Sequence, residues 1–224
     1  DGKPLDVMFD TLVLGPTIRE LMDAGYLCDY EIYAPPIGID VSTVKRKMGD
    51  FDSKELEAVV DKKSITGDAV AHYKTHARGK RCVVMCVSIK HAEHVAEQYQ
   101  AAGVSSGVIE GTMTGQQRDK MLADFAAGRL MVICNVQLLV EGVDIPAIEV
   151  VQWLRPTQSL VVWMQGNGRG LRPADNKTGL IIFDHVGNCL RHGLPDDDRE
   201  WSLEGKEKGK KKASADEVKI KQCG

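Results

Sequence analysis

The chain has 224 residues, of which 43% are hydrophobic and 27% are charged, and its formal net charge is −3. This length suits one large or two small domains, and the composition is ordinary for a globular protein. The negative net charge excludes a protein that binds nucleic acid through a generally basic surface, so any such contact must come from a local patch.

The sequence carries neither an apolar stretch of membrane-spanning length nor a signal-peptide pattern, so we expect no membrane partner. Three of the six cysteines, Cys82, Cys86 and Cys134, lie in apolar runs, and no two cysteines form a C-x-x-C pair. This pattern indicates a reducing compartment, and we expect a cytoplasmic protein without structural disulfides. Whether Cys223 belongs to a truncated zinc site stays open.

The first eighty residues predict helices, one strand and an irregular stretch. Thr17 is a favourable N-cap, Gly25 is a favourable helix end, and a Pro-Pro pair ends the strand. His72 and His76 lie four residues apart on one expected helix, but no third ligand is evident, so we predict no metal site. We expect helices at 18–24, 53–62 and 66–78, a strand at 29–34, and a loop or short helix at 40–52.

From residue 81 onward, strands alternate with helices of about ten to fifteen residues, which is the pattern of βαβ units and a parallel sheet. We therefore predict an α/β fold, a three-layer domain in which helices flank a mainly parallel sheet. Functional loops of such sheets follow the carboxyl ends of strands, where Ser88, Asn135, Arg155 and Asp184 stand. The strands are expected at 82–87, 104–109, 130–134, 149–154 and 179–183, and the helices at 91–102, 116–127 and from 159 onward.

The segment Trp-Met-Gln-Gly-Asn-Gly-Arg-Gly-Leu-Arg at residues 163–172 is the most informative part of the chain. Arg169 and Arg172 are three residues apart, so they share a face if the segment is helical. Gly168 and Gly170 leave the backbone open to close approach. Two guanidinium groups with no carboxylate between them suit a polyanion such as a triphosphate.

A second motif, Glu-Gly-Val-Asp-Ile-Pro at residues 141–146, follows the strand expected at 130–134. Together the two motifs resemble motifs V and VI of superfamily 2 helicases, the DEAD/DEAH-like ATP-dependent nucleic-acid motors, and most closely their phage and restriction-type branch. The resemblance is specific between residues 81 and 188. The family's Q-x-x-G-R-x-x-R is matched by Gln165, Gly168, Arg169 and Arg172, and its G-x-D by Gly142 and Asp144.

The resemblance implies the second, RecA-like motor domain of an ATP-dependent helicase or translocase. It implies catalytic roles for Arg169, Arg172 and Gln165, with the arginines acting as fingers toward ATP. Val140 departs from the family, whose motors commonly carry Thr there, and its side chain cannot hydrogen-bond. Nucleotide contacts are implied for Gly142, Asp144 and Gly168, and contacts to a nucleic-acid strand for Ser88, Thr112, Thr114, Asn135 and Gln137, each of which could equally be a helix cap or turn residue.

The sequence lacks G-x-x-x-x-G-K-[ST], the loop that cradles phosphates. We therefore expect ATP and Mg²⁺ to be bound mainly by an N-terminal RecA-like domain ahead of this chain, and the chain alone to hydrolyse little or no ATP. By the resemblance, residues 1–40 are the end of that first domain and a linker, 41–202 are the helicase C-terminal domain, and 203–224 are a flexible lysine-rich tail. The expected partner is single-stranded or duplex nucleic acid, with DNA favoured.

Two other functions compete with a motor domain. A RecA-like module that binds nucleic acid or another partner, without catalysis, would have the same fold, although both motif VI arginines argue against such a loss. The other is a dinucleotide-binding loop at residues 166–170. The sequence argues against it, because such a loop follows a strand and lies at the start of a helix. Here the glycines follow a helical pattern instead.

Overall fold

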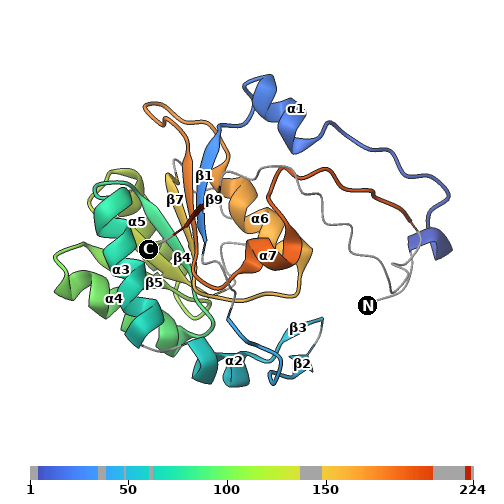
Figure 1. Ribbon diagram of the computed structural model, residues 1–224. Helices are drawn as coiled ribbons and strands as arrows, with labels where there is room; N and C mark the ends of the chain where they lie inside the picture. The colour runs from blue at the N-terminus through green and yellow to red at the C-terminus, as the bar shows by residue number, and fades with distance from the viewer. Residues whose placement is uncertain are drawn as a thin grey trace.

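A parallel sheet with helices on both faces forms the body of the protein in a computed structural model (Figure 1). The structure describes residues 5–34, 39–47, 49–60, 63–136, 148–203 and 220–222. The strands are β1 (Tyr30–Ala34), β2 (Arg46–Lys47), β3 (Asp50–Phe51), β4 (Cys82–Met85), β5 (Ser106–Ile109), β6 (Val132–Asn135), β7 (Val150–Trp153), β8 (Leu180–Asp184) and β9 (Ile220–Gln222). The helices are α1 (Ile18–Asp23), α2 (Ser53–Val60), α3 (Lys63–His76), α4 (Ile89–Ala101), α5 (Gly115–Ala126), α6 (Leu160–Gly170) and α7 (Asn188–His192), with a 3-10 turn at Leu5–Val7.

The large sheet has the strand order β5-β6-β4-β7-β8-β1-β9, and every neighbouring pair is parallel. All residues of β4, β6 and β7 are buried, because helices cover both faces of these central strands. The predicted α/β fold with a mainly parallel, flanked sheet is therefore confirmed.

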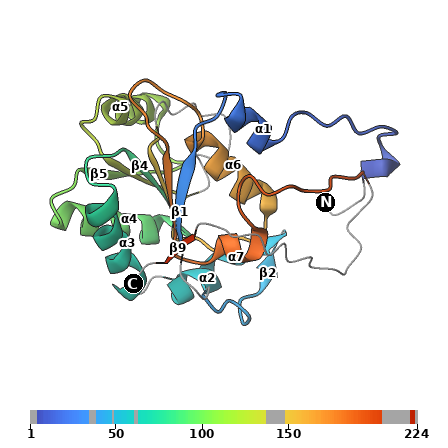
Figure 2. The same cartoon turned by 45° about the horizontal axis from the view of Figure 1, so that its top comes forward.

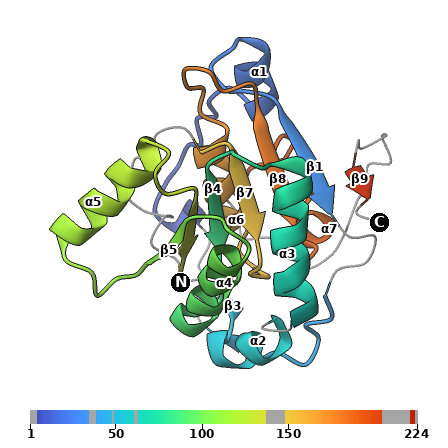
Figure 3. The same ribbon diagram turned by 90° about the vertical axis from the view of Figure 1, so that its left-hand side faces the viewer.

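The two faces of the sheet carry separate cores, since successive side chains of a strand point to opposite faces. On one face, Val84 packs with residues of α3 and α4, including Tyr73 and Tyr99. On the other, Val83 packs with Trp153 of β7 and Trp163 of α6. Figure 3 shows α3 and α4 in front of the sheet and α6 behind it. Each large side chain buried this way contributes roughly 1.5–3 kcal/mol.

Several helix ends carry residues that favour capping, among them Thr17 and Gly25, which the sequence predicts. Thr17 and Thr114 form capping boxes at the start of α1 and α5. Gly25, Gly103 and Gly128, which follow α1, α4 and α5, have φ between 70° and 78°, the left-handed conformation that glycine adopts without strain. No helix among the described residues is long and apolar enough to cross a membrane.

Residues 40–52 differ from the expected loop or short helix, because they contain the antiparallel pair β2–β3. Each strand has two residues, too few for an alternating pattern to show in the sequence. Tyr30–Ala34 pairs with β8 inside the main sheet, and Ile220–Gln222, expected in the flexible tail, pairs with β1. The division of the chain at residues 40 and 202 stays a prediction.

Candidate nucleotide and nucleic-acid interface

Helix α6 carries the arginine-containing motif. Ser159 caps its first turn by accepting a hydrogen bond from the Val162 amide at 3.3 Å. The helix begins after the carboxyl end of β7 and returns along the sheet, so its last turn lies near the amino ends of the strands. At that end, the Cys28 amide, just before β1, donates to the Leu171 carbonyl at 2.8 Å. Eleven residues of helix separate the two ends by about 16 Å.

The glycines of α6 serve packing as well as access. A Cβ atom on Gly166 would lie 2.6 Å from the Trp153 ring, and one on Gly170 would lie 2.6 Å from a Leu180 methyl group. We expected the backbone at Gly170 to be open to close approach. The Leu180 side chain at the start of β8 occupies that space instead, which corrects this expectation. A Cβ atom on Gly168 would have no atom within 4 Å, so of these three glycines this one leaves room beside α6.

Of the predicted catalytic residues, Gln165 and Arg169 lie on α6, and Arg172 lies just beyond its end. Gln165 and Arg172 are exposed, and Arg169 is partly buried. The helix ends at Gly170, and Arg172 follows its C-cap residue, Leu171, which keeps right-handed helical dihedrals (φ −77°, ψ −10°). The two arginines therefore stand at one end of the helix, where positive charge also complements the helix dipole.

The predicted nucleic-acid contacts lie at the opposite, carboxyl edge of the sheet. Ser88 caps α4 by accepting from the His91 amide at 3.1 Å, and Thr114 caps α5 by accepting from the Gln117 amide at 3.3 Å. Thr112 is exposed and donates to Glu110 at 2.9 Å. The alternative role of helix cap, which the sequence left open, is thus present for both Ser88 and Thr114.

Asn135 differs from the other candidates because it is fully buried. Its Nδ2 donates to the Val84 carbonyl at 3.0 Å, so the side chain ties β6 to β4. Four residues named in the sequence analysis lie outside the described residues. They are the predicted nucleic-acid contact Gln137, the predicted nucleotide contacts Gly142 and Asp144, and Val140 beside them in motif V.

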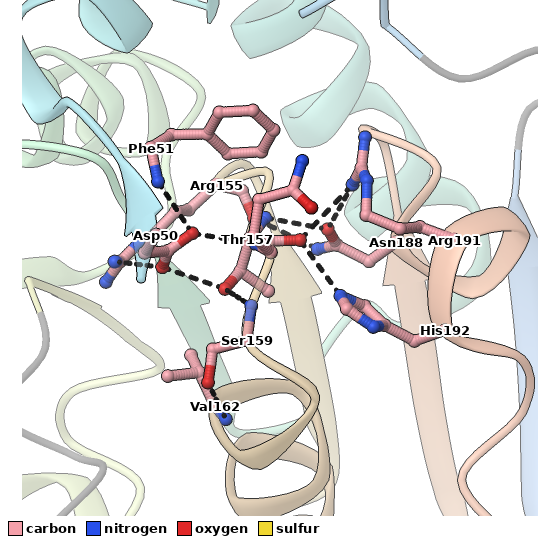
Figure 4. Close-up of polar contacts among 10 residues, drawn as sticks. Asp50, Phe51, Arg155, Thr157, Ser159, Val162, Asn188, Arg191 and His192 are labelled. Atoms are coloured by element: carbon pink, nitrogen blue, oxygen red, sulfur yellow. Dashed lines mark hydrogen bonds and ion pairs between the residues drawn. The ribbon is translucent and has the colours of Figure 1, made fainter. Parts of the chain in front are cut away.

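A polar network that the sequence did not predict surrounds the start of α6 (Figure 4). Asp50 of β3 accepts from Arg155 and from the Thr157 hydroxyl, both at 2.9 Å, and from the Gln158 amide at 2.7 Å. Asn188 of α7 holds the same loop through the Thr157 amide at 3.0 Å. Figure 2 shows α7 and β2 below α6 in that view, and the Arg191 guanidinium of α7 lies 5.5 Å from the centroid of the Phe51 ring of β3. The only sequence signal here was the position of Arg155 after a strand.

Asp184, at the end of β8, acts within the fold. Burial raises its pKa, while amide hydrogen bonds oppose the shift, including one from Cys189 at 2.7 Å. This geometry gives Asp184 a structural role at the end of β8. The part of the chain that the structure describes contains no group of three or more His, Cys, Asp or Glu side chains suited to a metal ion, and its five cysteines are not disulfide-bonded.

Comparisons with known proteins agree with this architecture. The chain is 34% identical over 215 residues to a "51.5 kDa protein" of Lactococcus phage (isolate 7-9), covering 96% of this chain and 47% of that protein. It is 26% identical over 190 residues to the "Putative ATP-dependent helicase IRC3" of Saccharomyces cerevisiae, covering 84% and 28%. The chain thus spans half or less of these relatives.

A solved structure shows the same fold. A fragment of a putative HsdR subunit of a type I restriction enzyme from Vibrio vulnificus YJ016 matches with a TM-score of 0.61 and 21% identity, over 84% of this chain and 38% of that one. The family described as "Helicase conserved C-terminal domain" matches residues 61–174, which include most of the sheet and the whole of α6. The chain therefore belongs to the helicase conserved C-terminal domain family of the superfamily 2 helicases and has the RecA-like fold of that domain.

Proposed function

We propose that this domain completes the ATP site of a nucleic-acid helicase or translocase from one side and grips a nucleic-acid strand at another edge. The observation that carries the proposal is the placement of Gln165 and Arg169 on α6 and of Arg172 just beyond its C-cap, with Gln165 and Arg172 exposed and Arg169 partly buried. Two guanidinium groups, one from the last turn of α6 and one from the residue after its C-cap, suit the charge of a triphosphate, because little reorganisation is needed when the charge develops.

The residues of this chain fit only part of an ATP site. The arginines suit the terminal phosphates, but the sequence does not contain the phosphate-binding motif G-x-x-x-x-G-K-[ST]. We therefore propose that a separate N-terminal RecA-like domain binds most of the nucleotide and its Mg²⁺. This proposal agrees with the larger size of the phage and yeast relatives, of which the chain covers 47% and 28%.

The proposed strand contacts come from Ser88, Thr112 and Thr114 at the carboxyl edge of the sheet, where each side chain is at least partly exposed. Such hydroxyl groups suit phosphate oxygens rather than base edges, so the contacts would be largely independent of sequence. DNA is favoured over RNA because the sequence resembles the phage and restriction-type branch. A cytoplasmic location also stays a prediction.

The test compares nucleic-acid-stimulated ATP hydrolysis by the full-length protein and by its Arg172→Ala variant. We expect a loss of roughly 10³-fold or more in stimulated kcat, with affinity for single-stranded DNA retained. Arg78→Ala is the control, because Arg78 is also exposed but follows α3 on the other face of the sheet. Absence of stimulated hydrolysis in the unmodified full-length protein would favour a binding module without catalysis.

A further inference from the structure

Lys177 lies against the end of α6 that carries the arginines. Its Nζ donates to the Gly170 carbonyl and, at 2.9 Å, to the carbonyl of Arg172 itself. The last carbonyls of a helix have no partner within the helix, so they need donors from elsewhere. Here the Lys177 ammonium supplies donors on both sides of Leu171, whose own carbonyl accepts from the Cys28 amide at 2.8 Å.

The chain between Arg172 and Lys177 is folded back to make this contact. The Lys177 amide donates to the Ala174 carbonyl at 3.1 Å, which closes a turn. Asn176 inside that turn has φ 62°, a left-handed conformation that asparagine tolerates better than most residues. The turn therefore places the Lys177 ammonium against the backbone carbonyl of Arg172, five residues earlier.

Lys177 is half-buried, so its contacts are made in surroundings that exclude much of the water. Burial lowers the pKa of its ammonium, while the nearby Cys28 opposes that shift. An ammonium in such surroundings is held by its hydrogen-bond acceptors, and removing it would leave the carbonyls of Gly170 and Arg172 without these donors. The contact thus fixes the backbone from which the Arg172 side chain extends.

We propose that Lys177 is a positioning residue for Arg172 in the hydrolysis of ATP. The inference rests on the proposed function, because it requires Arg172 to act on the nucleotide. A displacement of about 1 Å in a catalytic group can reduce the rate of a reaction by 10²-fold, so loss of the Lys177 contact is expected to slow hydrolysis by misplacing Arg172.

The experiment measures stimulated ATP hydrolysis by the full-length protein carrying Lys177→Met, Lys177→Arg, Arg172→Ala, or Lys177→Met with Arg172→Ala. Lys177→Met is expected to lower kcat by about 10- to 100-fold with little change in the KM for ATP. Lys177→Arg, which keeps the donors and the charge, is expected to restore most of the rate. Lys80→Met is the control, since Lys80 is a partly buried lysine outside this contact.

The double variant separates positioning from other roles. If Lys177 acts through Arg172, Lys177→Met causes no further loss once Arg172 has been replaced. Additive losses, or an increase in KM alone, would overturn the inference, because they indicate general destabilisation or direct contact with ATP. A large effect of Arg172→Ala with none of Lys177→Met would also overturn it. Equal rates for the unmodified protein and Arg172→Ala would instead count against the proposed function.

Discussion

Three glycines within five residues of α6 have different surroundings, and this difference can be measured. Gly166→Ala would place a methyl group 2.6 Å from the Trp153 ring, so we expect a loss of about 1–3 kcal/mol in the free energy of unfolding. Gly168→Ala meets no atom within 4 Å and is expected to gain up to about 1 kcal/mol from helix propensity. Urea unfolding of the two variants tests this contrast, and equal losses would contradict the packing of α6 on β7.

His185 gives the protein a dependence of stability on pH. Burial, and secondarily the neighbouring His72, lower the pKa of His185 to about 3. Below its ordinary pKa of about 6.5 the unfolded state therefore binds a proton that the folded state does not, so stability falls as the pH falls below that value. From pH 6.5 to 5 the expected loss in the free energy of unfolding is about 1.6 kcal/mol.

The measurement is urea unfolding at several pH values between 5 and 7.5, with His185→Phe as the comparison. This variant keeps a flat ring beside His72 but cannot bind a proton, so its stability should change less over the same range. His72 and His192 also have lowered pKa values, mainly through burial, and will leave a smaller residual slope. An unchanged slope in His185→Phe would show that His185 does not cause the effect.

At the scale of elements, the β2–β3 pair is attached to the loop before α6 by one carboxylate. The side chains of Asp50 and Arg155 are 16% and 7% exposed and lie 2.9 Å apart. Asp50→Ala removes this buried carboxylate from the Arg155 guanidinium and also removes the acceptor of the Thr157 hydroxyl and the Gln158 amide, so it is expected to cost about 3–5 kcal/mol in the free energy of unfolding. Asp40→Ala is the control, because Asp40 is exposed and is expected to cost less than about 1 kcal/mol.

Hydrogen exchange of the same Asp50→Ala variant locates the effect. The Gln158 amide donates directly to Asp50 at 2.7 Å, and the Val162 amide is held by the Ser159 cap. Both amides should exchange faster in the variant, while amides of β4 change only as much as global stability requires. Protection of Gln158 and Val162 equal to that in the unmodified chain would mean that Asp50 does not order the start of α6.

The elements that the sequence predicted correctly are those with local signals. Thr17 and Thr114 indicate where two helices begin, and the apolar runs of β4 and β6 predict buried strands. The contact between Asp50 and Arg155 spans 105 residues, and no periodicity or motif links positions so far apart. The motif at 163–172 makes Arg169 and Arg172 candidate site residues, and these roles stay predictions. The packing partners of its glycines depend on strand order, which the sequence does not encode locally.

At the scale of the whole molecule, the proposed ATP contacts and the proposed nucleic-acid contacts lie at opposite ends of the strands of one sheet. The arginine end of α6 lies near the amino ends of β1 and β8, where Cys28 bonds Leu171. The candidate strand contacts follow the carboxyl ends of β4 and β5. Because the net charge is −3, attraction of nucleic acid must come from a local surface rather than from the protein as a whole. Replacements at the two edges should therefore affect different measurements.

Two exposed threonines at these edges allow a matched comparison. Thr112 follows β5, whereas Thr178 precedes β8. Loss of one hydroxyl contact to phosphate costs about 0.5–1.5 kcal/mol, so Thr112→Ala should weaken binding of single-stranded DNA by the full-length protein about 2- to 13-fold, and Thr178→Ala should not. Fluorescence anisotropy with two oligonucleotides of different sequence, at low and moderate salt, measures both. Backbone contacts predict similar affinities for the two sequences and a steep decrease with salt. A strong sequence preference, or an equal effect of Thr178→Ala, would contradict a strand held at the carboxyl edge.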